Sequence, residues 1–213
     1  MSAVMPPSPE PIHVDASFLV VEKPPWLLSV PGRLIADCLA ARVQARWPDA
    51  LVVHRLDMGT SGLMLFARGL EAQRALSLAF EKRRVGKRYV AIVDGAVAEP
   101  AGTVDVPLIV DWPNRPRQIV DAERGKPALT HWRRVDVDSA RGRSRIELQP
   151  VTGRSHQLRV HLAHIGHPIL GDELYAPPAV HAASPRLLLH AARLEFRHPV
   201  SGDTVVVESP PPF

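Results

Sequence analysis

The segment between residues 51 and 67 reads LVVHRLDMGTSGLMLFA. Its two ends, residues 51–53 and 63–67, are apolar runs typical of buried strands. The polar stretch between them is therefore a loop that leaves the sheet at a fixed place, and Gly59 and Gly62 permit turns that other residues resist. Asp57 lies on this rigid mount, as a catalytic group requires. The alternative is a turn in which Asp57 only accepts hydrogen bonds from its own backbone.

Outward from this loop, short apolar runs alternate with a few amphipathic segments. Helical spacing predicts three helices. The first covers residues 34–47, with Leu34, Cys38, Leu39, Val43 and Trp47 inward, and the second covers residues 69–84, with Leu70, Ala75, Leu78 and Ala79 inward. The third follows Gly153 and stops at Gly166. Strands are expected at residues 18–22, 51–53, 63–67, 88–93, 103–107, 118–122, 130–137, 143–151, 187–190, 193–197 and 204–208. This order predicts an α+β fold with a mixed, mainly antiparallel sheet and flanking helices.

The two ends of the chain are rich in proline. Residues 1–16 are predicted to be a disordered or extended segment and residues 210–213 a tail. The stretch between them, residues 17–209, contains neither an internal repeat nor a long linker. It is therefore predicted to form a single domain.

The charge of the chain favours a polyanionic partner. The net charge is +4 with a pI near 9.7, and 22 of the 26 basic residues are arginine. Arginine suits RNA because its planar guanidinium makes paired hydrogen bonds to phosphate and stacks on bases. A GC-rich genome would also enrich arginine, so composition alone leaves both explanations open.

Other features of the sequence indicate a cytoplasmic protein. Cys38 is the single cysteine, so no internal disulfide can form. Residues 1–13 lack the pattern of a secretion signal, and the apolar run 51–67 is interrupted by His54, Arg55 and Asp57.

A second polar segment, residues 152–168, reads TGRSHQLRVHLAHIGHP. It opens at the expected N-terminus of the third helix, where unpaired backbone N–H groups favour anions. His156 and Arg159 are three residues apart and are expected to be neighbours on its polar face. His161, His164 and His167 suggest a metal, but steps of three rotate around a helix and no Cys or carboxylate joins them at ligand spacing, so no metal site is predicted.

Three motifs occur in order along the chain: HRLDxxTSG at residues 54–62, KxYxAxVxG at residues 87–95, and TGRxHQLRxH at residues 152–161, followed by GHPILGD at residues 166–172. Together they resemble the motifs of RluA-type pseudouridine synthases. Further stretches, LSVPGR (28–33), DWPNRP (111–116), GKP (125–127) and PRLLLH (185–190), are similar to short members of that family that modify both 23S rRNA and the tRNA anticodon stem-loop.

The resemblance implies a pseudouridine synthase fold with a central RNA-binding cleft, and an isomerase that flips a uridine out of RNA and needs no cofactor. It implies that Asp57 is the nucleophile, that Arg159 pairs with it, that Tyr89 stacks on the flipped base and that Arg55 fills the space the base leaves. Further RNA contacts are expected from Lys87, Arg154, His156, Arg83 and Arg84. The family usually acts as a monomer. Since the first strand is expected at residue 18, no N-terminal S4 domain is expected.

Each of these roles has a simpler alternative. Arg55 could be an ion-pair partner of Asp57, Arg159 a surface contact to phosphate, and Tyr89 a core residue of its strand. The basic residues around Arg83 could be a solvated helix end. The whole chain could also be a catalytically inactive RNA-binding protein on the same scaffold, or a hydrolase that uses Asp57 or a metal on a small substrate.

Overall fold

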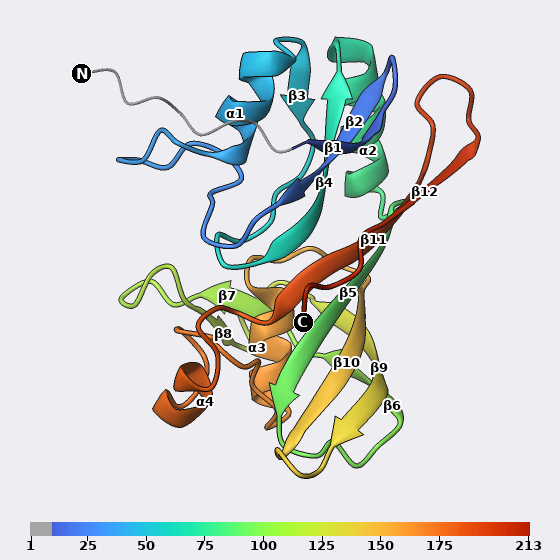
Figure 1. The fold of residues 1–213 in the computed structure, drawn as a ribbon. Coiled ribbons are helices and arrows are strands. Elements are labelled where there is room, and N and C mark those ends of the chain that lie inside the picture. Colours follow the sequence, from blue (N-terminus) through green and yellow to red (C-terminus); the bar gives the residue numbers. More distant parts are fainter. Residues whose placement is uncertain (1–9) are drawn as a thin grey trace. The chain divides into compact units, whose positions relative to one another are not determined.

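A computed structural model describes residues 10–213, which divide into two compact units. The first unit comprises residues 10–87 and 191–212, and the second comprises residues 88–190 with Phe213. As predicted, the fold is α+β with mostly antiparallel strands; residues 10–213 form four helices, where three were predicted (Figure 1). No helix among the described residues is long and apolar enough to cross a membrane.

The first unit is a sheet with a helix on each face. Its elements are β1 (Pro11–Val14), β2 (Phe18–Lys23), α1 (Leu39–Arg46), β3 (Ala50–Val52), β4 (Ser61–Arg68), α2 (Leu70–Glu81), most of β11 (Leu189–Arg197), and β12 (Thr204–Glu208). The strand order is β1-β2-β4-β11, with β3 paired to β4 and β12 paired to β11. The expected strands 187–190 and 193–197 are one continuous strand, β11, and β1 was not predicted.

Both faces of β2 and β4 are buried. Phe18 and Leu63 pack with α2 in one apolar cluster, whereas Leu19 and Met64 pack with α1 in another. Successive side chains of a strand point to opposite faces, so burial of both faces requires an unbroken apolar run. This explains why residues 63–67 do not alternate with polar residues.

The helix α1 begins at Leu39, five residues later than predicted. A parallel β-bridge between Leu28 and Cys38 holds Cys38 in an extended conformation, and its Sγ accepts a hydrogen bond from the Ala41 N–H as the helix cap. The expectation that Leu34 points inward is wrong, since its side chain is 93% exposed. Cys38 is fully buried, as a small apolar residue in a core is expected to be.

The helix α2 buries a different face from the one predicted. Ala72 and Leu76 are its buried residues, and Ala79 packs partly against the same cluster. Leu70 and Leu78, expected inward, are 62% and 48% exposed, and Ala75 is exposed as well. Residues 72, 76 and 79 lie three and four apart, which is the spacing of one helical face.

The second unit continues from the first through β5 (Gly86–Asp94). It contains β6 (Ala101–Asp105), β7 (Leu108–Val110), β8 (Gln118–Val120), β9 (Leu129–Asp138), β10 (Arg143–Pro150), α3 (Gln157–His164) and α4 (Pro178–Ala182). Its antiparallel strands follow the order β5-β10-β9-β6, and β7 and β8 form a separate hairpin. Leu158 and Leu162 of α3 pack against β5 and β10, as their spacing predicted. β7 and α4 were not predicted.

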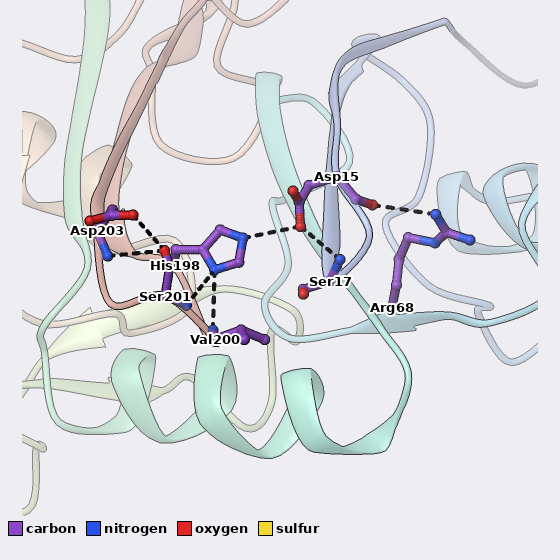
Figure 2. A network of polar contacts seen from close by, with 7 residues as sticks. All are labelled: Asp15, Ser17, Arg68, His198, Val200, Ser201 and Asp203. Atoms are coloured by element: carbon purple, nitrogen blue, oxygen red, sulfur yellow. Dashed lines mark hydrogen bonds and ion pairs between the residues drawn. The ribbon is translucent and has the colours of Figure 1, made fainter.

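In the first unit, the β1–β2 turn is tied to the loop that joins β11 and β12. The Nδ1 atom of His198 accepts hydrogen bonds from the N–H groups of Val200 and Ser201, both at 3.1 Å, and its Nε2 lies 3.1 Å from Asp15 Oδ1 (Figure 2). Because Nδ1 is an acceptor, Nε2 carries the proton. A hydrogen bond from the Ser17 N–H, with His198 beside it, lowers the pKa of the Asp15 carboxyl.

Candidate functional site

Asp57 lies in the loop between β3 and β4, and neighbouring side chains hold the loop's backbone on both sides of it. On one side, the Ser29 hydroxyl donates to the Leu56 carbonyl at 2.6 Å and accepts from the Leu56 N–H at 2.9 Å. The Asp57 carbonyl itself accepts a hydrogen bond from the Thr60 N–H at 3.1 Å. The side chain of Asp57 is half-buried. The sequence-based expectation of a rigid mount therefore has a physical basis in these bonds.

On the other side of Asp57, a buried lysine holds Met58. The Nζ atom of Lys23 donates to the carbonyls of Pro24 and Leu27, both at 2.8 Å, and of Met58 at 3.0 Å. Lys23 is completely buried. The N–H of Trp26, a residue with the left-handed φ of 65°, also donates to the Met58 carbonyl at 2.8 Å. Carbonyl groups from two separate segments thus share the ammonium charge, which fixes them relative to one another.

A glycine occupies the second position of β4 because no other residue fits there. Gly62 has φ 111°, and a Cβ atom there would lie 2.3 Å from the carbonyl oxygen of Ala191. Gly62 thus has the unusual φ that favours glycine, but it lies in β4 and not in the predicted turn. Gly59 does lie in the turn that the Thr60 N–H closes on the Asp57 carbonyl, and it does so without a positive φ.

A neutral histidine fixes the start of the loop. The His54 ring stacks on Phe80 with 4.5 Å between centroids, and its Nε2 atom accepts a hydrogen bond from the Leu65 N–H at 2.9 Å. Burial, with the positive charge of Lys87 adding to it, lowers the pKa of His54 to about 3. Arg55, the next residue, is exposed.

Positive charge gathers where α2 ends and β5 begins. Arg83, with a left-handed φ of 56°, and Arg84 are both exposed. Lys87 is half-buried, and burial, followed by repulsion from Arg83, lowers the pKa of its ammonium group. A negative charge bound beside Lys87 would oppose both effects.

In the second unit, the Arg159 guanidinium forms a buried, two-pronged ion pair with Asp172. Arg159 Nε and Nη2 lie 2.8 and 2.7 Å from the two carboxylate oxygens of Asp172, which also accepts from the N–H groups of Leu174 and Tyr175. The guanidinium carbon lies 5.1 Å from the centroid of the Tyr175 ring. With only 5% of Arg159 exposed, the alternative of a surface contact to phosphate is wrong.

The polar face predicted for α3 is also wrong, because every residue from 157 to 162 is buried. His156 is the N-cap, with φ 54°, and its Nδ1 lies 2.7 Å from the Tyr175 hydroxyl. Gln157 closes the same end, since its Oε1 accepts from the Arg154 N–H and from the Thr152 hydroxyl. The polar side chains at the start of α3 therefore form hydrogen bonds to other groups of the protein and do not form an exposed polar face.

Two more of the predicted residues lie in this unit. Tyr89, on β5 opposite Leu148, is half-buried and packs against the cluster that includes α3. Arg154 is half-buried, and its Nε donates to the Pro127 carbonyl at 3.1 Å. His161 is buried next to Thr130, and burial lowers its pKa to about 4. Among residues 10–213, no three His, Cys, Asp or Glu side chains are grouped so as to hold a metal ion.

The structure thus sorts the predicted residues into two sets. The first unit carries Asp57 and Arg55 in one loop, with Arg83 and Arg84 just before β5 and Lys87 at its start; the second carries Tyr89, Arg154, His156 and Arg159. The expected pair of Asp57 with Arg159 joins the two units and stays a prediction. Sequence reasoning missed Lys23, Ser29, Asp172 and Tyr175. For Asp172 a signal existed, because the stretch GHPILGD carries an acidic residue shortly after the helix that contains Arg159.

Comparisons with known proteins agree with the motifs. A sequence model of the family described as RNA pseudouridylate synthase matches residues 17–164. The proteins called dual-specificity RNA pseudouridine synthase RluA from Pasteurella multocida and from Escherichia coli K12 are each 48% identical to this chain over 204 residues, covering 95% of this chain and 93% of theirs. The solved structure of human RNA pseudouridylate synthase domain containing 1 is 30% identical with a TM-score of 0.81, and the match covers 95% of this chain and 83% of that one.

Proposed function

Since this chain belongs to the RNA pseudouridylate synthase family, and is therefore an isomerase that makes pseudouridine in RNA, we propose that Asp57 is its nucleophile and that it modifies both 23S rRNA and the tRNA anticodon stem-loop. The observation that carries the nucleophile assignment is the loop of Asp57, whose backbone is bonded on both sides by buried side chains. The dual substrate rests on the two bacterial relatives, which are called dual-specificity enzymes and match along nearly their whole length.

The reaction itself needs no redox partner. The N1–C1′ bond of uridine breaks, the base turns over, and a C5–C1′ bond forms; the proton on C5 leaves and N1 gains one. The residue that attacks must be held at a fixed position, since a displacement of about 1 Å can cost about a hundredfold in rate. The bonds to Leu56 and Met58 support Asp57 in this role because they restrain the main chain directly before and after it.

Arg159 is proposed to pair with the Asp57 carboxylate. A guanidinium at contact distance stabilises the ionised form of a carboxylate and fixes its orientation. The two-pronged bond to Asp172 supports this role, since it holds the guanidinium plane in one orientation before any RNA binds. Arg159→Ala is expected to reduce turnover more than RNA affinity.

The remaining residues are proposed to handle the RNA. Tyr89 stacks on the flipped uridine, and Arg55 fills the space that the base leaves in the stem-loop. Arg83, Arg84, Lys87, Arg154 and His156 contact the RNA backbone. Substitution of Arg83 and Arg84 should weaken binding of all RNA substrates and flatten its salt dependence, because each phosphate contact releases counterions. We also propose that residues 17–209 work as one catalytic domain, as a monomer in the cytoplasm.

Tritium release from RNA tests these assignments. Transcripts of a tRNA anticodon stem-loop and of 23S rRNA fragments, labelled with tritium at uridine C5, would be incubated with the wild-type protein and with Asp57→Asn. Release from both RNAs by the wild type, abolished in Asp57→Asn while RNA affinity persists, is expected. Near wild-type turnover by Asp57→Asn would falsify the nucleophile assignment, and release from only one RNA would contradict dual specificity.

A further inference from the structure

We infer that Ser29 is a positioning residue for the nucleophile: its hydroxyl sets the place of Asp57 through the backbone of Leu56. The inference rests on the proposed role of Asp57. Ser29 lies in the segment between β2 and α1, 27 residues before Leu56, so the contact is made by the fold rather than by neighbouring residues. Both residues are buried, with 4% of Ser29 and 7% of Leu56 exposed.

The geometry of this contact is tighter than a single hydrogen bond. The same Oγ atom donates to the Leu56 carbonyl at 2.6 Å and accepts from the Leu56 N–H at 2.9 Å. A hydroxyl has one proton to donate and lone pairs to accept with, so one side chain satisfies both polar groups of one residue. The two bonds together restrain the peptide groups on either side of the Leu56 Cα, and the second of these groups leads directly to Asp57.

The contact is also distinct from the Lys23 bonds on the far side of the loop. Lys23 and Trp26 reach the Met58 carbonyl, which follows Asp57, whereas Ser29 reaches Leu56, which precedes it. A loop held at one end can pivot about that end. With both ends held, the Cα of Asp57 has one position, which is the geometric condition for attack on a base presented by the RNA.

The chain contains a matched control for the loss of this hydroxyl. Ser144 on β10 is also buried, donates to the Gly95 carbonyl at 2.8 Å and accepts from the Val97 N–H at 2.9 Å. It therefore also donates one bond to backbone and accepts one from it, but with two different residues, in the segment of the second unit that follows β5. Ser144→Ala removes the same chemistry without touching the loop of Asp57.

The test compares single-turnover tritium release by the full-length wild type, Asp57→Asn, Ser29→Ala, Ser29→Thr and Ser144→Ala on the tRNA anticodon stem-loop transcript, with RNA affinity and melting temperature measured for each. Ser29→Ala should lower the single-turnover rate about tenfold to a hundredfold. Its RNA affinity should stay within about twofold of the wild type, because Ser29 is buried and acts through the backbone. Ser144→Ala should lower the melting temperature by a similar amount but leave the single-turnover rate unchanged. Ser29→Thr keeps a hydroxyl and should retain most of the wild-type rate.

The results separate failure of this inference from failure of the Asp57 assignment. If Asp57→Asn is inactive but Ser29→Ala turns over as fast as Ser144→Ala, Ser29 has only a structural role and the inference is wrong. If Asp57→Asn is as active as the wild type, the nucleophile is another residue. Should Ser29→Ala fail to fold, Ser29→Cys decides: its longer, weaker bonds displace Leu56 while filling the space, so a wild-type rate in that variant overturns the inference.

Discussion

The two units hold their proposed catalytic residues by different means. In the first unit, Ser29 and Lys23 bond to the backbone around Asp57, and the charges involved are one ammonium and several neutral carbonyls. In the second unit, the side chain of Arg159 itself is held, by the full negative charge of Asp172. Hydrogen bonds to the backbone fix the position of a residue's main chain, whereas an ion pair to the side chain fixes the orientation of its charged group. A nucleophile needs the first and a guanidinium partner the second.

The largest expected effect comes from breaking the charged anchor. Asp172→Asn leaves the Arg159 guanidinium buried opposite a neutral amide, so the free energy of unfolding should fall by about 3–5 kcal/mol. Ser29→Ala leaves only neutral backbone groups without their partner, and should cost about 1–3 kcal/mol. Urea denaturation of the two variants measures the difference.

An exposed ion pair provides the control for this comparison. Glu10→Gln removes the partner of Arg46 in a pair whose side chains are 80% and 50% exposed, and it should change the stability little because solvent screens that pair. If Asp172→Asn were no more destabilising than Glu10→Gln, the buried ion pair would not be the anchor of Arg159.

A second comparison uses the neutral histidine of each unit. Burial lowers the pKa of His54 to about 3 and that of His161 to about 4, against an ordinary 6.5. Their contribution to stability is present above pH 6.5 and is lost as the pH falls towards these values, because only the unfolded chain takes up the protons. At pH 5.5, each histidine should already have lowered the free energy of unfolding by roughly 1.4 kcal/mol relative to its value well above pH 6.5.

His54→Gln and His161→Gln test this, since a glutamine oxygen can also accept a hydrogen bond. Between pH 6.5 and pH 4, the free energy of unfolding of each variant should fall less steeply with decreasing pH than that of the wild type. The difference in slope corresponds to about one proton taken up per molecule on unfolding. Equal slopes for the wild type and both variants would mean that these histidines titrate normally in the folded protein.

A third comparison concerns strain, because each anchor lies beside a residue with a left-handed backbone. Trp26 has φ 65° next to the loop of Asp57, and His156 has φ 54° at the start of α3. At both positions the glycine variant should be more stable than the alanine variant by about 1 kcal/mol, since a Cβ atom disfavours this conformation.

The same substitution pair should have the opposite sign in α2. Ala75→Gly, at an exposed helical position, should lose about 1 kcal/mol relative to the wild-type alanine. Thermal unfolding of the glycine and alanine variants at positions 26 and 156 and of Ala75→Gly measures these differences. An alanine variant at position 26 or 156 as stable as its glycine counterpart would show that the backbone relaxes to negative φ without cost.

The smallest effect is expected at the contact between the two turns of the first unit (Figure 2). Because the pKa of Asp15 is lowered below 3.8, its contribution is present above that pH and lost as the pH falls through the lowered value. Asp15→Asn should therefore cost at most about 1 kcal/mol at pH 7, since the group is partly exposed to solvent. The difference from the wild type should vanish in acid, and a constant difference down to pH 2 would contradict the assignment.

Local patterns predicted most strands but failed where a distant contact overrode them. The unbroken apolar run 63–67 is β4 because both of its faces are covered. In contrast, the helical spacing from residue 34 was misleading. The bridge between Leu28 and Cys38 extends the backbone there, and α1 starts only at Leu39. In α2, two helical faces have similar apolar content, and only the position of the sheet selects Ala72 and Leu76.

The site residues divide in the same way. Asp57, Tyr89 and Arg159 could be named from motifs, because each stands at a recognisable spacing within a short stretch. Lys23 and Ser29 could not. A lysine after a buried strand indicates a strand end in solvent, and a serine before Pro31 indicates a loop. Their roles depend on Leu56 and Met58, which no local pattern connects to them.

The sequence by itself determined the family, the order of most strands and the identity of the proposed nucleophile. Only the tertiary structure decided which charges are buried and what holds them: Lys23 against carbonyls up to 35 residues away, Ser29 against Leu56, and Arg159 against Asp172. The physical reason is the range of the forces. Hydrophobic periodicity is a property of neighbouring residues, whereas a hydrogen bond requires two particular atoms within about 3 Å, and the fold alone brings such atoms together.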